Sequence, residues 1–204
     1  MYNMKRTIIL SLAAFSLLAC SQPAQQSSPS FEEVLTTRRS VRSYDASKTI
    51  SEAEIRTLLT AAQEAPSWAN MEPTKYYVAI GPEKRAALLE MIGGNKERVA
   101  NAPVLIVSTF ETGKSGFFRG QATNEVGDGW GAYDNGLSNA YLVLQVRAMG
   151  FDTLIMGMRQ ADAIRAEFAI PESETIMAVI AVGYRAGEPS RPARRDLDEI
   201  VQFF

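Results

Sequence analysis

The sequence predicts an α+β fold in which helices cover both faces of a central sheet, a three-layer α/β/α sandwich. Helical and strand-like segments follow one another without strict βαβ alternation. Very apolar strand candidates at 104–110 and 175–184 indicate strands that are covered on both faces. The part of the chain after residue 30 is long enough for one domain with one hydrophobic core, and no repeat or linker divides it.

Two capping boxes place the first two helices. In Ser30-Phe31-Glu32-Glu33 and in Ser51-Glu52-Ala53-Glu54, a serine stands three residues before a glutamate, and each can satisfy a backbone amide near the other. Helices are therefore predicted from about residues 31 and 52. The second helix should end at Ala65, because the residue before a proline is forced out of the α region.

The remaining elements follow from the spacing of apolar residues and from the glycines and prolines that end each segment. Strands are predicted at 76–80, 104–110, 151–156 and 175–184, and helices at 83–91, 133–149 and 161–168. Residues 111–129 contain five glycines and are predicted to form a long loop, a kind of segment that is often functional.

The helix predicted at 133–149 is the longest and carries a stripe of apolar residues along one side. They are Leu137, Ala140, Tyr141, Leu144 and Ala148. Such a stripe is typical of a helix that packs in the core or against a second subunit.

The composition excludes most catalysis by side chains alone. The chain has no histidine and one cysteine, Cys20, which excludes Ser-His-Asp and Cys-His catalysis, zinc bound by histidine and an intrachain disulfide. A metal site or an acid/base pair made only of carboxylates stays open, although no acidic cluster such as D-x-D-x-D-G is present. We therefore expect that a cofactor supplies the chemistry.

The first thirty residues have the pattern of an export signal followed by a tether. Lys5 and Arg6 precede an apolar run over 8–18, which predicts a secretory signal peptide over residues 1–19. Leu17-Leu18-Ala19-Cys20 resembles the bacterial lipobox, in which Cys20 is lipidated after cleavage. Residues 20–30, rich in Gln, Ser and Pro, predict a flexible tether rather than the alternative of a buried N-terminal helix, and the folded domain is expected over 31–204.

These features predict an exported protein that is anchored by lipid to the cell envelope. Ser21 after the cysteine favours the outer membrane, with the domain on its periplasmic or surface side. Cleavage would also remove Lys5 and Arg6, which lowers the basic residues from 21 to 19 against 23 acidic ones. Without a basic excess, nucleic acid is not expected as a partner.

Two segments offer what a phosphorylated, planar cofactor needs. The first, Arg38-Arg39-Ser40-Val41-Arg42-Ser43-Tyr44, contains three guanidiniums that can clamp an anion. In an extended chain Ser40 and Arg42 share one face while Val41 turns into the core. The alternative is a solvated helix end. The second segment, Pro66-Ser67-Trp68-Ala69-Asn70-Met71-Glu72-Pro73, combines a backbone restricted by prolines with polar groups and amide donors.

Together these segments resemble the nitroreductase family of FMN-dependent oxidoreductases. The matching motifs cover nearly the whole mature chain in the family's order. They are Arg-Arg-Ser-x-Arg-x-Tyr at 38–44, Pro-Ser-x-x-Asn-x-x-Pro at 66–73, Asp134 opening the long helix, Met156-Gly157 after a strand, and Gly183-Tyr184 followed by Arg194-Arg195. The resemblance implies a nitroreductase-like sandwich with a mostly antiparallel central sheet.

The resemblance also implies how FMN would be bound. The residues expected around its phosphate and ribityl chain are Arg38, Arg39, Ser40, Arg194 and Arg195. Arg42 would reach the N1/O2 edge of the flavin, where its charge favours the reduced form. The loop residues that a partner subunit would lay against the cofactor are Pro66, Ser67, Trp68 and Asn70. The amides of Met156 and Gly157 would lie near flavin N5.

A site shared in this way implies a homodimer. The long helix would contribute to its interface, and the C-terminal tail would form an arm around the partner, with packing on its own subunit as the alternative. The apolar residues of this tail are Leu197, Ile200, Val201, Phe203 and Phe204.

The implied reaction passes reducing equivalents from NAD(P)H through FMN to a nitroaromatic, a quinone or a similar electron-poor acceptor, with no catalytic side chain. Glu72, Thr74 and Met156 depart from the glutamine, tryptophan and glutamate found at these positions in family members, which leaves the specificity of the pocket open. Because NAD(P)H is expected to be scarce outside the cytoplasm, an alternative is a membrane-tethered flavin module that a partner protein reduces.

Overall fold

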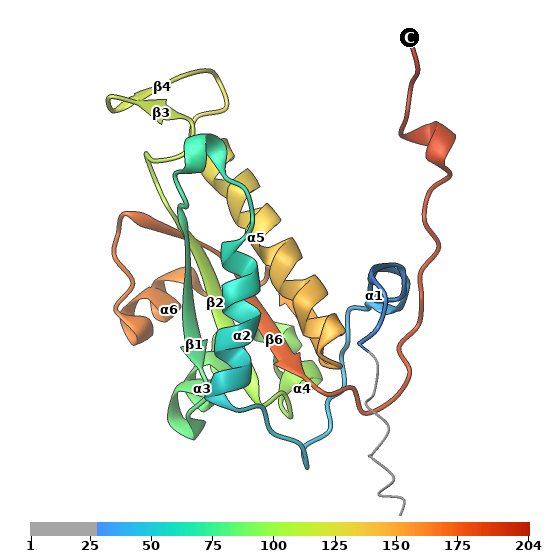
Figure 1. Ribbon diagram of the computed structural model, residues 1–204. Helices are drawn as coiled ribbons and strands as arrows, with labels where there is room; N and C mark the ends of the chain where they lie inside the picture. Colours follow the sequence, from blue (N-terminus) through green and yellow to red (C-terminus); the bar gives the residue numbers. More distant parts are fainter. Residues whose placement is uncertain (1–27) are drawn as a thin grey trace, which may run out of the picture.

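A computed structural model describes residues 28–204, so the predicted signal peptide, Cys20 and most of the tether lie outside the described residues. The helices are α1 (Phe31–Thr37), α2 (Glu52–Gln63), α3 (Pro82–Glu90), α4 (Lys96–Val99), α5 (Gly129–Ala148) and α6 (Ala161–Phe168) (Figure 1). The strands are β1 (Thr74–Ala79), β2 (Val104–Glu111), β3 (Phe117–Phe118), β4 (Gln121–Ala122), β5 (Asp152–Met156) and β6 (Glu174–Gly183).

Four of the strands form the central sheet in the order β1-β2-β6-β5, and every neighbouring pair is antiparallel. The predicted mostly antiparallel sheet is therefore confirmed. At its outer edge, next to β5, Ser40 forms a parallel bridge with Thr153. The arginine segment thus lies alongside the sheet.

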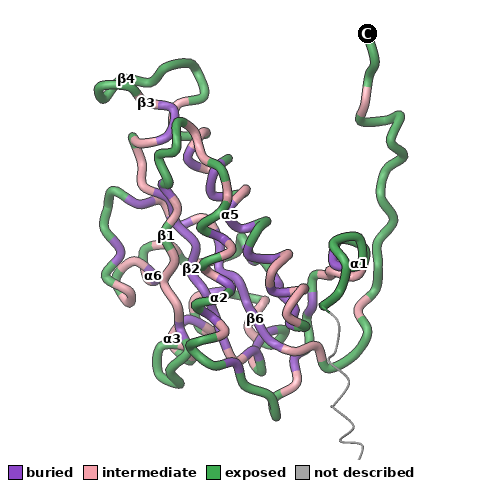
Figure 2. Tube along the Cα trace, in the orientation of Figure 1, coloured by how far each residue is buried: buried purple, intermediate pink, exposed green. Residues whose placement is uncertain are grey.

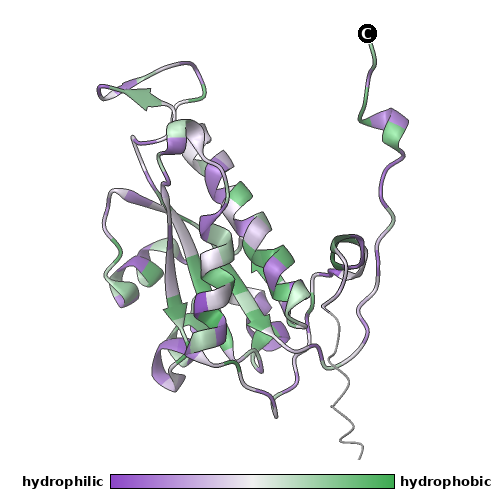
Figure 3. Cartoon of the chain, viewed as in Figure 1, coloured by the Kyte–Doolittle hydropathy of each residue, from purple (hydrophilic) through white to green (hydrophobic). Residues whose placement is uncertain are grey.

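The sheet separates two hydrophobic cores, which confirms the predicted three layers. Val104 and Ile106 of β2 pack in the core beneath α2 and α5, whereas Leu105 and Val107 pack in the core beneath α3 and α6. Because successive residues of a strand point to opposite faces, a strand buried on both faces reads as one apolar run. Figure 3 shows this run as hydrophobic colour along β2 and β6.

The ends of several elements follow the predictions. Both capping boxes form, with the side chains of Ser30 and Ser51 accepting from the amides of Glu33 and Glu54 at 3.2 Å. The predicted strands and helices are all present, with boundaries shifted by at most four residues. The largest shift is in α5, which begins at Gly129 instead of residue 133.

The early start of α5 and the short elements near it were not predicted. A Cβ atom on Gly131 would collide with the ring of Phe110, so this glycine serves the close packing of the helix on β2 rather than a loop. Within the predicted loop, β3 and β4 form a two-stranded hairpin. The short helix α4 carries too few residues for a periodic apolar pattern.

The first half of α5 turns polar residues toward the sheet, the second half buries Leu142 and Val146 in the core, and the predicted apolar stripe faces outward. Asp134, Asn135, Ser138 and Asn139 are buried, whereas Ala140 and Tyr141 are exposed. Leu137, Leu144 and Ala148 of the predicted stripe are half-buried. This orientation disfavours the core interpretation of the stripe and agrees with its interpretation as an interface.

The C-terminal residues form an arm that extends away from the sheet and its helices (Figure 1), and Figure 2 shows it as almost wholly exposed. Its apolar side chains are exposed too, with Ile200 at 65 % and Phe203 at 91 %, apart from the half-buried Val201. The arm therefore does not bury these side chains on its own subunit, which was the alternative to an arm around the partner. None of the described helices is both long enough and apolar enough to cross a lipid bilayer.

Candidate functional site

The arginine segment begins where α1 ends. Arg38 caps the helix in an extended conformation, with φ −60° and ψ 132°, and its amide still donates to the carbonyl of Val34 at 3.0 Å. The amide of Val41 donates to the carbonyl of Thr153 at 2.9 Å, which fastens the segment to β5. As predicted, Val41 is buried while Ser40 and Arg42 are exposed.

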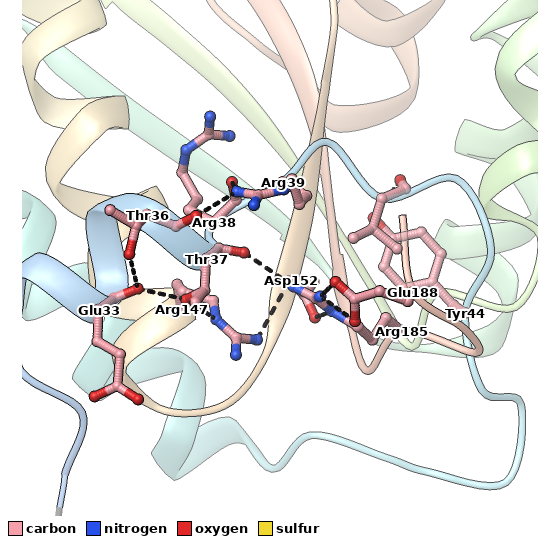
Figure 4. Close-up of polar contacts among 11 residues, drawn as sticks. Glu33, Thr36, Thr37, Arg38, Arg39, Tyr44, Arg147, Asp152, Arg185 and Glu188 are labelled. Carbon is pink, nitrogen blue, oxygen red and sulfur yellow. Dashed lines mark hydrogen bonds and ion pairs between the residues drawn. The ribbon is translucent and has the colours of Figure 1, made fainter. Parts of the chain in front are cut away.

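Arg38 lines a cavity of about 460 Å³ between α5, the edge strand β5 and its neighbour β6. This cavity, which we call the Arg38 cavity, has mostly apolar walls. Its lining residues are Arg38, Ala132, Asn135, Gly136, Asn139, Ala140, Val143, Leu144, Ile155, Met177 and Ala178. Within residues 28–204 the Arg38 guanidinium has no hydrogen-bond or ion-pair partner, and Figure 4 shows it pointing away from the Asp152 ion pairs.

Arg39 lies in a group of positive charges. Its Nη1 donates to the carbonyls of Thr36 and Arg38, both at 2.7 Å, while its Nε is buried without a partner among the described residues. Burial, and then the charges of Arg191 and Arg185, lower the pKa of Arg39. A buried donor without a partner beside an excess of positive charge is suited to an anion.

Arg42 is placed beside this group and folds back on its own segment. Its Nη1 donates to the carbonyl of Ser40 at 3.2 Å. The side chain is exposed and can turn toward a ligand at the edge of the sheet.

Met156 and Gly157, whose amides were expected near flavin N5, lie at the end of β5 next to Ile155, and neither lines the Arg38 cavity. The side chain of Met156 is buried in the core, so only its backbone can meet a ligand. Gly157 is exposed, and no atom lies within 4 Å of the position that a Cβ would take there, which leaves room for a close approach. Ile155, which was not predicted, is half exposed and lines the Arg38 cavity.

A polar turn at Gly93–Asn95, which the sequence did not single out, packs beside the residues that follow β5. The amide of Gln160 donates to the carbonyl of Met91 at 2.8 Å, and a Cβ on Gly93 would lie 3.1 Å from Sδ of Met158. Arg98 of α4 donates to Oδ1 of Asn95 in this turn at 3.2 Å. The Gly93-Gly94 pair was interpreted only as a helix end, although it also introduces these polar side chains.

The loop over residues 66–73, which we call the proline loop, is held in an unusual backbone conformation. Ala69, Asn70 and Glu72 have φ of 48°, 55° and 47°, the left-handed region that residues with a Cβ seldom adopt. The amide of Trp68 donates to Oδ2 of Asp134 at 3.0 Å. Asp134 is thus the anchor of the loop, buried in the second turn of α5, and does not open the helix as predicted.

Two hydrogen bonds inside the loop complete its shape. Oγ of Ser67 accepts from the amide of Glu72 at 2.9 Å, and Nδ2 of Asn70 donates to the carboxylate of Glu72 at 3.0 Å. Strain of this kind persists only where the surroundings hold it, and it is frequent at functional sites.

The structure does not bring the two predicted halves of the site together within one chain. Pro66 and Ser67 line a second cavity, of about 450 Å³, between α2, β1 and the start of α5. No residue of the loop lines the Arg38 cavity. A single chain therefore places the loop and the arginine segment at separate sites.

Arg194 and Arg195 also lie away from the Arg38 cavity. Both are exposed on the C-terminal arm. The tail arginine that lies near Arg39 is Arg191, whose charge contributes to lowering the pKa of Arg39. Sequence reasoning missed Arg191 because it stands outside the Arg-Arg pair. Among the described residues, no group of three or more Cys, Asp or Glu residues could hold a metal ion.

Comparison with known proteins identifies related chains. A sequence model of the Nitroreductase family matches residues 35–184. YodC of Bacillus subtilis, for which NAD(P)H nitroreductase activity is proposed, is 28 % identical over an alignment of 188 residues, with 80 % of this chain and 93 % of YodC covered. The NADH dehydrogenase of Thermus thermophilus is 27 % identical over 188 residues, with 80 % of this chain and 91 % of that protein covered.

Solved structures have the same fold. A protein of Exiguobacterium sibiricum crystallised with FMN superposes with a TM-score of 0.78 at 22 % identity, over 88 % of this chain and 99 % of its own. CLA-ER, a gut-bacterial enone reductase, superposes with a TM-score of 0.77 at 20 % identity, over 85 % of this chain and 97 % of its own. These likenesses establish the nitroreductase-like fold that the sequence predicted.

Proposed function

Since the chain belongs to the nitroreductase family, we propose that it is an FMN-dependent oxidoreductase that passes reducing equivalents from NAD(P)H to a nitroaromatic, a quinone or a similar electron-poor acceptor. The observation that carries the proposal is Arg38, which lines the Arg38 cavity and whose guanidinium has no partner among the described residues. A cation beside an apolar cavity matches a ligand that combines a phosphate with a planar ring system.

Residues that line the Arg38 cavity, and residues that adjoin them in the chain, would bind FMN group by group. Arg38 and Arg39 would hold the phosphate, and the unpartnered Nε of Arg39 supports this role. Ser40 and Arg42 are exposed beside them, at the same edge of the sheet. Gly157 and the backbone of Met156 would approach the ring, while apolar residues of α5, β5 and β6 exclude water from it. When bound, FMN supplies the transfer of two electrons from a nicotinamide to the acceptor.

No acidic or basic catalytic side chain is needed. Among the described residues that line the Arg38 cavity, Arg38 alone is ionisable, and a guanidinium offers hydrogen-bond donors but no acceptor. Protons would therefore come from water or from the reactants. This is consistent with a chain that contains no histidine.

We further propose a homodimer in which each site combines residues of both subunits. The outward apolar stripe of α5 and the exposed side chains of Leu197, Ile200, Phe203 and Phe204 provide an apolar surface that a second copy can cover. In such a dimer, the loop residues Pro66, Ser67, Trp68 and Asn70 of one subunit would reach the Arg38 cavity of the other. The arm would carry Arg194 and Arg195 toward the partner. The separation of the two halves within one chain supports this arrangement.

We also propose that the protein is exported and lipidated at Cys20. Residues 20–30 would tether it to the envelope, and residues 31–204 would form the FMN domain. The lipobox-like sequence carries this proposal. It also favours a second candidate function, a membrane-tethered flavin module that a partner protein reduces in place of NAD(P)H.

Anaerobic titration of the purified, flavin-loaded chain separates the two candidates. Loss of flavin absorbance on addition of NADH or NADPH, and its return on addition of a quinone or nitroaromatic, is the expected result for the enzyme. If dithionite bleaches the flavin but neither nicotinamide does, the electron-transfer module is favoured. A purified chain that neither contains nor takes up FMN would contradict both candidates.

A further inference from the structure

Asp152 lies outside the Arg38 cavity but organises the arginines next to it. It is the first residue of β5, and its side chain is 1 % exposed. Arg185 donates to both carboxylate oxygens, from Nε to Oδ2 at 2.7 Å and from Nη2 to Oδ1 at 2.6 Å. Nη1 of Arg147 lies 3.5 Å from Oδ1. A buried carboxylate must be paired in this way, so Asp152 holds both arginines in place.

Both arginines extend from Asp152 to Thr37, the last residue of α1 (Figure 4). Nη2 of Arg185 donates to the carbonyl of Thr37 at 3.3 Å, and Nε of Arg147 donates to its hydroxyl at 3.1 Å. That hydroxyl donates to the carbonyl of Glu33 at 2.6 Å. The end of α1 is therefore held by two groups that share one buried anchor.

The chain beyond the arginine pair is held by the next residue of the same strand. Thr153 forms the parallel bridge with Ser40 and accepts from the amide of Val41 at 2.9 Å. Arg38 and Arg39 thus lie between two points of attachment, and both points originate from the start of β5.

We propose that Asp152 is a positioning residue for phosphate binding: through Arg185 and Arg147 it fixes the end of α1 and so directs Arg38 and Arg39 at the flavin phosphate. The inference rests on the proposed function, because it requires these arginines to bind FMN. Simple electrostatics predicts the opposite effect of Asp152. It is a negative charge near an anion site, so its removal by itself would strengthen the binding of a phosphate.

The test compares FMN with riboflavin, which has the same ring system and no phosphate, in the purified full chain. The wild-type chain is expected to prefer FMN. Asp152→Asn keeps the size of the side chain and removes its charge. It should weaken FMN binding by about tenfold or more, because charge-assisted contacts depend on geometry, and it should leave riboflavin binding unchanged.

Two further variants make the result decisive. Thr37→Val removes the hydroxyl that Arg147 contacts and buries no charge, so a smaller loss of FMN affinity in the same direction is expected even if Asp152→Asn does not fold. Glu174→Gln alters another buried carboxylate, which binds Tyr77 and Thr109 elsewhere in the sheet, and should change neither affinity.

An unchanged or stronger preference for FMN in Asp152→Asn and Thr37→Val would overturn the positioning role. An equal loss for FMN and riboflavin would overturn it too, since that is the signature of a general folding defect. If the wild-type chain itself binds no FMN, the proposed function fails and the positioning role fails with it. If the wild-type chain prefers FMN and the variants retain that preference, only the positioning role fails.

Discussion

Asn135 on α5 donates from Nδ2 to Oγ of Ser108 on β2 at 2.9 Å, and the two residues are 1 % and 0 % exposed. Asn139 joins them, donating to Oδ1 of Asn135 at 2.9 Å and accepting from Ser108 at 3.0 Å. The central strands thus offer hydrogen-bond partners to the polar side of the helix. Because buried polar groups must be paired, this network, together with the buried side chains of Leu142 and Val146, determines which side of α5 faces outward.

The outward side of α5 should therefore hold the dimer together. Tyr141 is exposed in the single chain, so Tyr141→Asp should leave the subunit folded and place an unpaired carboxylate in the interface. We expect a dissociation constant raised by about 100-fold or more, since burial of an unpaired charge costs several kcal/mol. Light scattering after size exclusion measures the mass. The exposed Thr57→Asp on α2 is the matched control, and a dimeric Tyr141→Asp would argue against this interface.

The same network predicts how stability changes at high pH. Burial raises the pKa of Tyr76 to about 12, while its hydrogen bond to Ser138 acts in the other direction. In the unfolded chain tyrosine titrates near 10. The native state therefore retains the phenolic proton to a higher pH than the unfolded state does. The stabilisation is complete below about pH 10 and is lost between about pH 10 and 12, by at most ~1.4 kcal/mol per pH unit for this group.

Urea denaturation of wild type and Tyr76→Phe from pH 8 to 11.5 measures this effect. The variant should start less stable, because Ser138 and Asn139 lose a partner. It should then lose less stability as the pH rises through the alkaline range. Parallel curves for the two proteins would contradict the assignment to Tyr76.

The sequence was sufficient to predict the layers and most of the elements, because apolar spacing and capping boxes are local signals. It could not show which side of α5 is buried, since that depends on partners such as Ser108 that lie on another element. The start of α5 was missed for a related reason, because Gly131 looks like a loop residue until its contact with Phe110 is known. Local pattern therefore predicts elements better than it predicts the faces they bury.

In the candidate site, too, a local pattern predicted some residues and could not predict others. Arg38 and the extended segment after it could be predicted, because guanidiniums close together in sequence stay close in space. Asp152 and Arg191 could not, since folding brings them to the arginine pair from elsewhere in the chain. The anchor between Asp134 and Trp68 was likewise missed, although both residues belong to motifs that the sequence singled out.

The N-terminal prediction can be tested independently of the fold. Cys20→Ser removes the sulfur that lipid would modify and leaves residues 31–204 unchanged. We expect the variant to bind FMN as the wild type does and to move from the membrane fraction to the soluble fraction, because the lipid would be its main attachment. Ser21→Ala, next to it, should keep the protein in the membrane fraction. Equal membrane fractionation of wild type and Cys20→Ser would contradict lipidation.

Arg38 provides the most direct test of the cofactor site. Because its guanidinium has no partner within residues 28–204, Arg38→Ala removes no internal hydrogen bond and should leave the free energy of unfolding of the apoprotein nearly unchanged. The bound phosphate loses a charge-assisted contact of about 1.5 to 3 kcal/mol, which corresponds to FMN binding that is about 10 to 150 times weaker. Flavin absorbance after dialysis measures the occupancy. Lys84→Ala, which breaks an exposed ion pair with Glu167 on the other face of the sheet, is the control that should retain its flavin. Full retention of FMN by Arg38→Ala would move the phosphate site away from the arginine segment.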